Sequence, residues 1–399
     1  MSFKPVVRFA VVSDVHYADS LPHSYEQFKL AMERTYQYCD GQEYNRLDAL
    51  YVNGDFVHKS LRSQFESFYE DCQKYVKPET LLVCTLANHE LHYDGDWLKS
   101  RDTFKEIFNM PTDRHEVING YHFISLSGGL VKGPWHDSYS DEQKEYLKAE
   151  LDKAVSDCGN RPIFVFQHVP MFGTLPSIGG NGDLTHILSH YPQVIDFSGH
   201  SHYACNSPRE IHQQTFTSVG SGALISAGVS TIMNGVVASE NLDKKYASHM
   251  LIVEADANST VRIRRFSVCE NKFFDDDSYI EPITDVRDFK YTDRRALTAA
   301  TPYFSEGAKI EFKRNDGKIT MSFPRAKCDT ERVYEYRVCL FDKNGTVLSQ
   351  KSALSDYNVV DQSDSYTWEI DDMPKAEYAK FYAIGFWDNI SEPVTVDII

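Results

Sequence analysis

The first half of the chain alternates short apolar runs with amphipathic stretches. The apolar runs are rich in Val, Ile, Leu and Phe and end in polar residues, which predicts buried strands at 6–12, 49–52, 81–86, 163–166 and 194–197. Between them, apolar positions recur at three- and four-residue steps, which predicts helices; one such series is Tyr25, Phe28, Met32 and Tyr36. Ser140 and Gln143 have the spacing of a capping box that opens another helix. Strands that alternate with helices predict a parallel sheet with helical crossovers.

The pattern changes in the second half, where strand-like segments follow one another. Three of them are expected to extend the sheets of the first half: 216–219, 250–253 and 261–268. The stretch 270–300 has no clear period and is interpreted as a linker. Beyond it, period-two runs separated by turn signals predict a small all-β sandwich, with strands at 308–312, 319–323, 334–341, 366–370 and 378–387. We therefore expect two domains, at 1–285 and 286–399.

Charge and composition narrow the partners that we expect. The chain carries 41 Lys and Arg against 58 Asp and Glu, a net charge of −17, which repels nucleic-acid backbones and anionic membranes. No run of about 18 apolar residues exists, so no membrane span is expected. Met1 leads into the first strand without a signal-peptide pattern, which favours a cytoplasmic location. The eight Cys lack CxxC spacing and are expected to be reduced, buried thiols. Nothing in the pattern indicates an oligomeric state.

Residue types that bind metals follow five of the predicted strands. The blocks are Asp14-Val15-His16, Asn53-Gly54-Asp55, Asn88-His89-Glu90, Gln167-His168 and His200-Ser201-His202. Ligands of open α/β sheets gather beyond the carboxyl ends of the strands, where these blocks fall. A single Asp-x-His block more often caps or hydrogen-bonds than binds a metal. Five blocks in sequence are hard to explain structurally, because a core gains nothing from burying so many ionisable groups.

In this order the blocks resemble the pattern of the calcineurin-like metallophosphoesterase family: Asp-x-His, Gly-Asp, Gly-Asn-His-Asp/Glu, a single His and Gly-His-x-His. The resemblance extends over about residues 6–270. It implies a four-layer α-β-β-α sandwich, an α/β fold that is followed in this chain by the C-terminal all-β sandwich. It also implies two divalent metal ions, one bound by Asp14, His16 and His202, a second bound by Asn88, His168 and His200, and both bridged by Asp55.

The resemblance further implies the chemistry of the site. Two divalent ions about 3.5–4 Å apart need a bridging carboxylate and lower the pKa of a shared water, so that a hydroxide attacks phosphorus in line. His89 takes the place of the family's catalytic His and is expected to assist the leaving oxygen. Imidazole ligands favour Mn, Fe or Zn, and the identity of the metals stays open. We expect hydrolysis of a small phosphorylated substrate, with phosphodiesters favoured over phosphomonoesters. The alternative is a metal-binding scaffold of the same fold with little or no catalysis.

Three positions leave alternatives open. Ala87 replaces the family's usual Gly before Asn-His, where the backbone could require an unusual conformation. His58 stands where the purple acid phosphatase branch carries an iron-binding Tyr, which argues against that branch. Its side chain either points at the site or caps the next helix. Glu90 either supports the site, for example by orienting His89, or forms a surface salt bridge.

Other features carry less weight. His186 and His190 have the helical i, i+4 spacing of a metal pair but fit better as exposed side chains of an amphipathic segment. The Gly-rich stretch 173–182 suits either a rim over the site or an ordinary loop. The C-terminal unit loosely resembles fibronectin type III-like or Ig-like domains. No function follows from this resemblance, which rests on Trp368, Pro374 and Tyr378.

Overall fold

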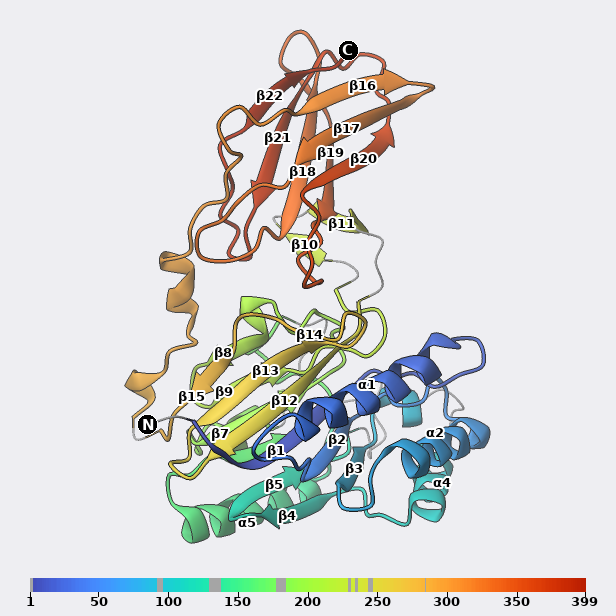
Figure 1. Cartoon of the computed structure of the whole chain (residues 1–399), viewed down its shortest axis with the longest axis vertical. Coiled ribbons are helices and arrows are strands. Elements are labelled where there is room, and N and C mark those ends of the chain that lie inside the picture. The colour runs from blue at the N-terminus through green and yellow to red at the C-terminus, as the bar shows by residue number, and fades with distance from the viewer. Residues whose placement is uncertain are drawn as a thin grey trace. The chain divides into compact units, whose positions relative to one another are not determined.

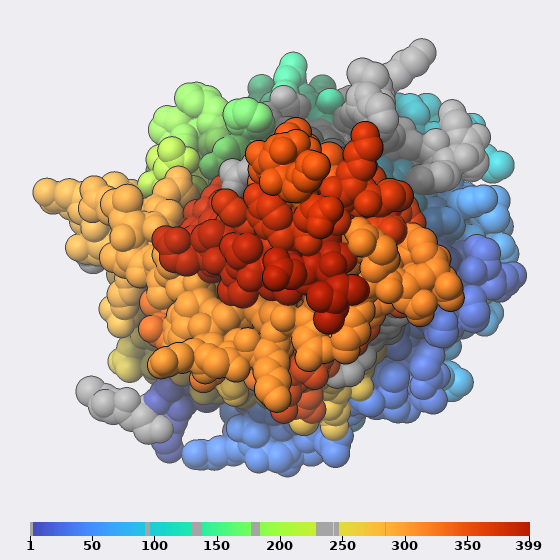
Figure 2. All heavy atoms as spheres, turned by 90° about the horizontal axis from the view of Figure 1, so that it is seen from above, coloured from blue at the N-terminus to red at the C-terminus, as the bar shows by residue number. Residues whose placement is uncertain are grey.

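A computed structural model of the chain describes residues 3–91, 96–128, 138–176, 184–228, 231–233, 236–242, 247–283 and 285–399. The chain divides into two compact units (Figures 1 and 2). One comprises Met1–Ala227 and Ala247–Thr292, and the other comprises Gly228–Tyr246 and Asp293–Ile399. Most of the Gly-rich stretch 173–182 lies outside the described residues.

The first sheet of the N-terminal unit is built around a parallel core of three strands, β1, β2 and β3, which are joined by helical crossovers as the pattern predicts. Strands from later in the chain extend it in antiparallel fashion, and two of these, β14 and β15, lie where the sequence indicates a linker. In order across the sheet, the strands are β14 (Lys272–Phe273), β13 (Val261–Ser267), β12 (His249–Asp256), β1 (Pro5–Val12), β2 (Ala49–Asn53) and β3 (Leu81–Thr85), with β15 (Ser278–Ile280) paired to β13.

The second sheet of this unit has parallel inner strands and antiparallel edges. β5, β6, β7 and β9 run parallel, whereas β4 and β8 pair antiparallel at the two edges. In order across the sheet, the strands are β4 (Arg114–Ile118), β5 (Tyr121–Ser125), β6 (Ile163–Phe166), β7 (Val194–Ser198), β9 (Thr217–Gly220) and β8 (Ile211–Gln213).

The two sheets pack face to face through an aromatic core. Phe9 of β1 contacts Phe123, Phe164 and Phe197 of the second sheet, with ring centroids 5.1, 4.8 and 5.9 Å away. Because successive side chains of a strand point to opposite faces, the neighbouring Ala10 faces outward and joins the core beneath the helices. The alternation within β1 therefore supplies both an inner and an outer core.

Helices cover the outer face of each sheet and complete the four layers (Figure 1). The helices are α1 (His23–Asp40), α2 (Arg62–Tyr75), α3 (Asn88–Leu91), α4 (Trp97–Phe108), α5 (Asp141–Cys158), α6 (Thr185–Leu188) and the 3-10 turns η1 (Pro208–Glu210), η2 (Val286–Asp288) and η3 (Asp293–Leu297). α1, α2 and α4 pack on the first sheet through Phe28, Phe65 and Phe104. α5 and α6 pack on the second sheet through Leu147 and Leu188. The predicted α-β-β-α fold class is thus confirmed.

Several local sequence signals have the expected outcome. α5 begins with the predicted capping box, in which Ser140 Oγ accepts from Gln143 N at 3.2 Å and Gln143 Oε1 accepts from Ser140 N at 3.2 Å. All eight Cys are free thiols, and five of them are buried. Among the described residues, no helix combines the length and the apolar character needed to cross a membrane.

The C-terminal unit is an all-β sandwich, as its period-two segments predict. Its two sheets enclose a core that includes Tyr336, Trp368 and Phe381. One sheet has the order β16 (Glu311–Asn315), β17 (Lys318–Pro324) and β20 (Ser365–Asp371). The other has the order β10 (Thr231–Met233), β11 (Val236–Asn241), β19 (Val347–Leu354), β18 (Glu335–Phe341), β21 (Tyr378–Ile384) and β22 (Val394–Asp397). β10 and β11 come from the sequence between β9 and β12, which therefore contributes a hairpin to this unit.

Candidate metal centre

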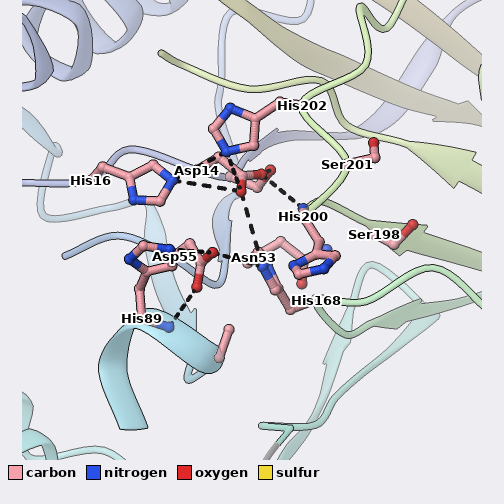
Figure 3. Close-up of polar contacts among 12 residues, drawn as sticks. Asp14, His16, Asn53, Asp55, His89, His168, Ser198, His200, Ser201 and His202 are labelled. Atoms are coloured by element: carbon pink, nitrogen blue, oxygen red, sulfur yellow. Dashed lines mark hydrogen bonds and ion pairs between the residues drawn. The ribbon is translucent and has the colours of Figure 1, made fainter. Parts of the chain in front are cut away.

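Seven of the eight predicted site residues converge at the carboxyl ends of the parallel strands (Figure 3). Asn88, the eighth, is buried at the start of α3 and directly precedes His89. Each side chain is placed by the end of a strand: Asp14 and His16 follow β1, Asp55 follows β2, Asn88 and His89 follow β3, His168 follows β6, and His200 and His202 follow β7. Because parallel strands end at the same edge of a sheet, positions far apart in sequence meet here.

Asp14, His16 and His202 form the first group that could hold a metal ion. The Nε2 atoms of the two imidazoles lie 3.2 Å apart, and Asp14 Oδ1 lies 3.2 Å from His202 Nε2 and 3.9 Å from His16 Nε2. His202 Nδ1 donates to the carbonyl of Ile225 at 3.1 Å, which turns Nε2 toward the group. The second oxygen of Asp14 is held by Ser13 Oγ and by the backbone N–H of His200.

Asp55, His168 and His200 form the second group. His168 Nε2 lies 3.1 Å from Asp55 Oδ2, while its Nδ1 donates to the carbonyl of Asn53 at 2.8 Å. Asp14 Oδ1 lies 4.0 Å from His168 Nε2, so the two groups adjoin. The Gly of the Gly-Asp block is needed here, because a Cβ on Gly54 would lie 2.5 Å from His168 Nδ1.

The electrostatics of the site favour a bound positive charge. Burial opposes ionisation of Asp14 and Asp55, but the neighbouring imidazoles outweigh it and hold the pKa of both carboxyls well below the usual range. Burial lowers the pKa of His16 to about 3 and that of His200 to about 4, which leaves these rings neutral. Burial also opposes protonation of His168, yet Asp55 raises the pKa of His168 to about 10. The two ionised carboxylates thus stabilise positive charge at the site, which the proton on His168 supplies in the metal-free chain and which a metal ion would supply in its place.

Several donor atoms of the site also fit metal ions by their geometry. Asn88 Oδ1 is buried without a hydrogen bond, and Asp14 Oδ1 and His168 Nε2 are buried with only the ion-pair contacts given above. Two imidazole nitrogens that bind one ion at about 2.0–2.1 Å with a tetrahedral angle lie roughly 3.3 Å apart. The separation of 3.2 Å between His16 Nε2 and His202 Nε2 agrees with this value. Buried polar atoms normally have partners, so these atoms are suited to a ligand that the protein atoms do not supply.

Several residues in the loops that carry the site have a strained backbone. Five of the predicted ligands have a left-handed backbone, with φ of 53° at Asp14, 53° at His16, 52° at Asp55, 67° at His200 and 53° at His202. This conformation costs a non-Gly residue about 1–2 kcal/mol. Backbone hydrogen bonds between the loops hold it, for example from His16 N to Asp55 O at 2.9 Å. Strain of this kind marks a functional site.

His89 lies at the edge of the site next to Asp55. Its backbone N–H donates to Asp55 Oδ1 at 3.0 Å, and its Nδ1 donates to the carbonyl of His58 at 2.7 Å. Its Nε2 lies 3.9 Å from Asp55 Oδ2, and the side chain is 14% exposed, so that this nitrogen remains reachable from solvent. The side chain of His58 approaches His16 and His89, with one ring nitrogen of each within 4.8 Å of the others. The side chain of His58 therefore points at the site, which is one of the two alternatives that the sequence left open.

Glu90 supports the site in a way that the sequence did not indicate. Its side chain is fully buried, which rules out the surface salt bridge. Its carboxylate accepts hydrogen bonds from the backbone N–H groups of Asp55 at 3.0 Å, Val57 at 2.9 Å and Ala87 at 2.9 Å. Burial and the Asp55 carboxylate raise the pKa of Glu90 to about 8, while the bonds from Val57 and Ala87 act in the opposite direction. Glu90 thus ties the loop after β2 to the loop after β3, rather than orienting His89 directly.

The structure also answers the questions that the sequence raised about Ala87 and about the pair His186 and His190. Ala87 is not among the residues with positive φ, so replacing the family's Gly causes no strain there. α6 ends at Leu188, before His190. His190 Nδ1 donates to the carbonyl of His186 at 2.8 Å, and His190 is exposed, in agreement with the interpretation of an amphipathic surface segment.

Comparison with known proteins identifies the family. Residues 7–204, which carry every predicted site residue, match the model of the calcineurin-like phosphoesterases. Through its N-terminal unit, the chain belongs to this family. Metallophosphoesterases of this fold use two divalent metal ions, and the two groups of Asp and His described above could hold them. No curated protein matches the chain.

Matches to solved structures have low sequence identity. A purple acid phosphatase from yellow lupin (Lupinus luteus) seeds is 13% identical with a TM-score of 0.48; the match covers 72% of this chain and 56% of the lupin chain, so this chain spans little more than half of that length. A hypothetical protein from Pyrococcus horikoshii is 11% identical with a TM-score of 0.31, covering 71% of this chain and 92% of that one. Fibronectin(III)-like modules from Clostridium thermocellum are 12% identical with a TM-score of 0.14, covering 43% and 93%.

Proposed function

We propose that the protein is a metal-dependent hydrolase of phosphoric esters that uses two divalent metal ions. The observation that carries this proposal is the pair of adjoining groups of Asp and His at the strand ends, within a chain segment that matches the calcineurin-like phosphoesterases. Phosphodiesters are the favoured substrates, and phosphomonoesters are the second class. The net charge of −17 favours a small phosphorylated substrate over nucleic acid.

The proposed ligands divide into two sets joined by one carboxylate. Asp14, His16 and His202 would hold one ion, Asn88, His168 and His200 would hold the other, and the carboxylate of Asp55 would serve both. The contact of 4.0 Å between Asp14 Oδ1 and His168 Nε2 supports a close pair of ions. The mixture of imidazole, carboxylate and amide donors favours Mn, Fe or Zn.

His89 is the proposed catalytic residue for the leaving group. When bound, a pair of divalent ions polarises the phosphoryl oxygens and lowers the pKa of the attacking water. The carbonyl of His58 accepts from His89 Nδ1, so Nε2 is the nitrogen that can donate a proton to the leaving oxygen. When Nε2 gives up this proton, the ring keeps the proton on Nδ1 and with it the bond to the carbonyl.

A hydrolysis assay with chelation tests the proposal. We expect metal-loaded protein to hydrolyse p-nitrophenyl phosphate or bis(p-nitrophenyl) phosphate, EDTA to abolish this activity, and Mn²⁺ to restore it better than Mg²⁺, which accepts few imidazole ligands. Full activity after exhaustive EDTA treatment would contradict the proposal. Two bound ions without turnover of either ester would favour the alternative, a scaffold of the same fold without catalysis. The presence of His89 argues against that alternative, since a scaffold has no need of a group for the leaving oxygen.

A further inference from the structure

The backbone brings His58 alongside the first metal-binding loop. Beyond β1 and β2, the two chains continue side by side: His16 N donates to Asp55 O at 2.9 Å, Tyr17 N to Phe56 O at 2.9 Å, and His58 N to Tyr17 O at 3.1 Å. Tyr17 and Val57 form a parallel bridge. This pairing fixes the ring of His58 with its centroid 5.6 Å from that of His16.

His58 belongs to a third cluster of imidazoles. Its ring centroid lies 5.4 Å from that of His89, and the rings of His16 and His89 are 4.4 Å apart. One nitrogen from each of the three rings lies within 4.8 Å of the others. Donors that share one oxygen at about 2.8 Å can be separated by up to roughly 4.8 Å, so three nitrogens within 4.8 Å of one another can serve a common anionic oxygen as well as a metal ion.

The surroundings of His16 decide between these two occupants. His16 Nε2 faces His202 Nε2 at 3.2 Å and Asp14 Oδ1 at 3.9 Å, which commits it to the first metal group. A cation near His58 and His89 would then keep only two imidazoles as ligands, and Asp55 Oδ2 lies 3.9 Å from His89 Nε2. An anion at this position needs no carboxylate ligand, because the imidazole N–H groups can donate hydrogen bonds to it directly. The side chain of His58 is partly exposed, as contact with a substrate requires.

We infer that His58 is a substrate-contacting residue rather than a metal ligand. Its ring N–H donates to a phosphoryl oxygen next to the oxygen served by His89, so that the two imidazoles hold the leaving-group side of the phosphoryl group. This inference rests on the proposed function, because it assumes that the site takes phosphoric esters. It assigns to the side chain of His58 a role separate from that of its carbonyl, which orients His89.

Two variants of His58 and one control test the inference. His58→Ala removes the ring, and His58→Gln keeps an N–H donor without the imidazole; both retain the backbone carbonyl. His190→Ala is the matched control, because His190 is exposed and bonds only within its own segment among the contacts described. Three quantities are measured on Mn²⁺-loaded protein: the bound metal content, the dissociation constant for inorganic phosphate by calorimetry, and kcat and KM on bis(p-nitrophenyl) phosphate.

We expect the metal content of all three variants to equal that of the unmodified protein. His58→Ala should bind inorganic phosphate about tenfold more weakly, as the loss of one hydrogen bond to an anion predicts, and His58→Gln should recover most of this affinity. kcat/KM should fall at least as much in His58→Ala, with His190→Ala unchanged. Recovery by Gln separates a hydrogen-bond donor from a merely structural side chain.

The inference is overturned if His58→Ala loses a metal ion, which would assign His58 to a metal site, or if its phosphate affinity and kcat/KM match those of the unmodified protein. Absence of phosphate binding to the unmodified metal-loaded protein would overturn it as well. Phosphate binding that depends on His58, in a protein that hydrolyses neither aryl ester, would uphold the contact while the proposed hydrolysis fails. The two proposals thus fail by different results.

Discussion

Replacing Glu90 by Gln should weaken both the fold of the N-terminal unit and its metal binding, because this carboxylate holds two loops of the site together. Its Oε2 accepts from the N–H groups of Asp55 and Ala87, and its Oε1 accepts from that of Val57. Gln offers one carbonyl oxygen and one NH₂ group. The oxygen can take the place of Oε2, but the NH₂ group then faces the N–H of Val57, which loses its acceptor.

The magnitude follows from the number of acceptors lost. A buried N–H without an acceptor costs about 1–3 kcal/mol. Glu90→Gln should therefore lower the free energy of unfolding of the Mn²⁺-loaded protein by that amount, because cations bound at Asp55 offset the charge that raises the pKa of Glu90 and so favour its ionised form. Glu90→Ala removes the acceptor of all three N–H groups, with a cost up to three times as large where water does not enter. Native proteins are stable by only about 5–15 kcal/mol, so the Ala variant should lie near the limit of folding, and Gln is the variant to measure.

Urea unfolding and metal analysis provide the assay. The Gln variant should unfold at lower urea concentration than the unmodified protein and should retain less than its full complement of Mn²⁺ after dialysis, because the loop of Asp55 is no longer held. Glu145→Gln, at an exposed position on α5, is the control and should change neither quantity. If Glu90→Gln stays within about 0.5 kcal/mol of the unmodified protein and keeps its metal content, the reasoning is refuted.

Four further outcomes are expected. Asp55→Asn should weaken the binding of both ions, because the bridge loses its charge; titration with Mn²⁺ measures this, and loss of a single ion would contradict the bridging role. His89→Ala should keep its metal content and lower kcat by about 10²–10⁴-fold, and loss of a metal would contradict its assignment. Burial raises the pKa of Asp196 to about 8, so the folded chain holds a proton that the unfolded chain releases above about pH 4, and stability falls as the pH rises between these values. Asp196→Asn should remove this dependence and melt above the unmodified protein at pH 8.5, as thermal melting from pH 5 to 9 would reveal; equal pH profiles would contradict it. Excision of 228–246 together with 293–399 should leave a folded, metal-binding unit, because Ala227 N donates to Ala247 O at 3.2 Å and a short linker can join these ends; circular dichroism and metal analysis test this, and an unfolded product would contradict it.

The pattern of hydrophobic residues was sufficient to predict the layers of the fold. The run at 6–12 corresponds to β1 (Pro5–Val12), and the series beginning at Tyr25 lies in α1. Such segments are long, periodic and fully buried on at least one face, so local pattern and tertiary packing agree. The sequence predicts a linker where the short strands β14 and β15 lie, because two or three residues are too few to show a period. The single domain boundary expected near residue 285 stays a prediction. One boundary in the sequence cannot assign the segment 228–246 to the C-terminal unit, because the strand β11 in this segment pairs with β19, about a hundred residues later.

The candidate site was predictable as a set of residues but not as a set of contacts. The motif blocks named all the Asp and His residues that Figure 3 labels, because the chemistry of metal binding restricts residue types at strand ends. The sequence offers a supporting role for Glu90 as one of two alternatives but not the form it takes, because its partners are backbone N–H groups, which have no sequence signature. The orientation of His58 was left open because it depends on the pairing of two loops beyond the ends of β1 and β2.

The strained backbone of the site explains why turn rules fail exactly where the function lies. Sequence rules assign a left-handed backbone to Gly, and to Asn or Asp in second place, because other side chains pay for it sterically. At His16, His200 and His202 the same residue has to make the turn and, in the proposed function, also supply an imidazole, so Gly is not an option. Five such residues cost roughly 5–10 kcal/mol in total, comparable to the whole stability of a domain. The aromatic core between the sheets has to offset this cost, and ions bound to the same five side chains would stabilise the strained loops further.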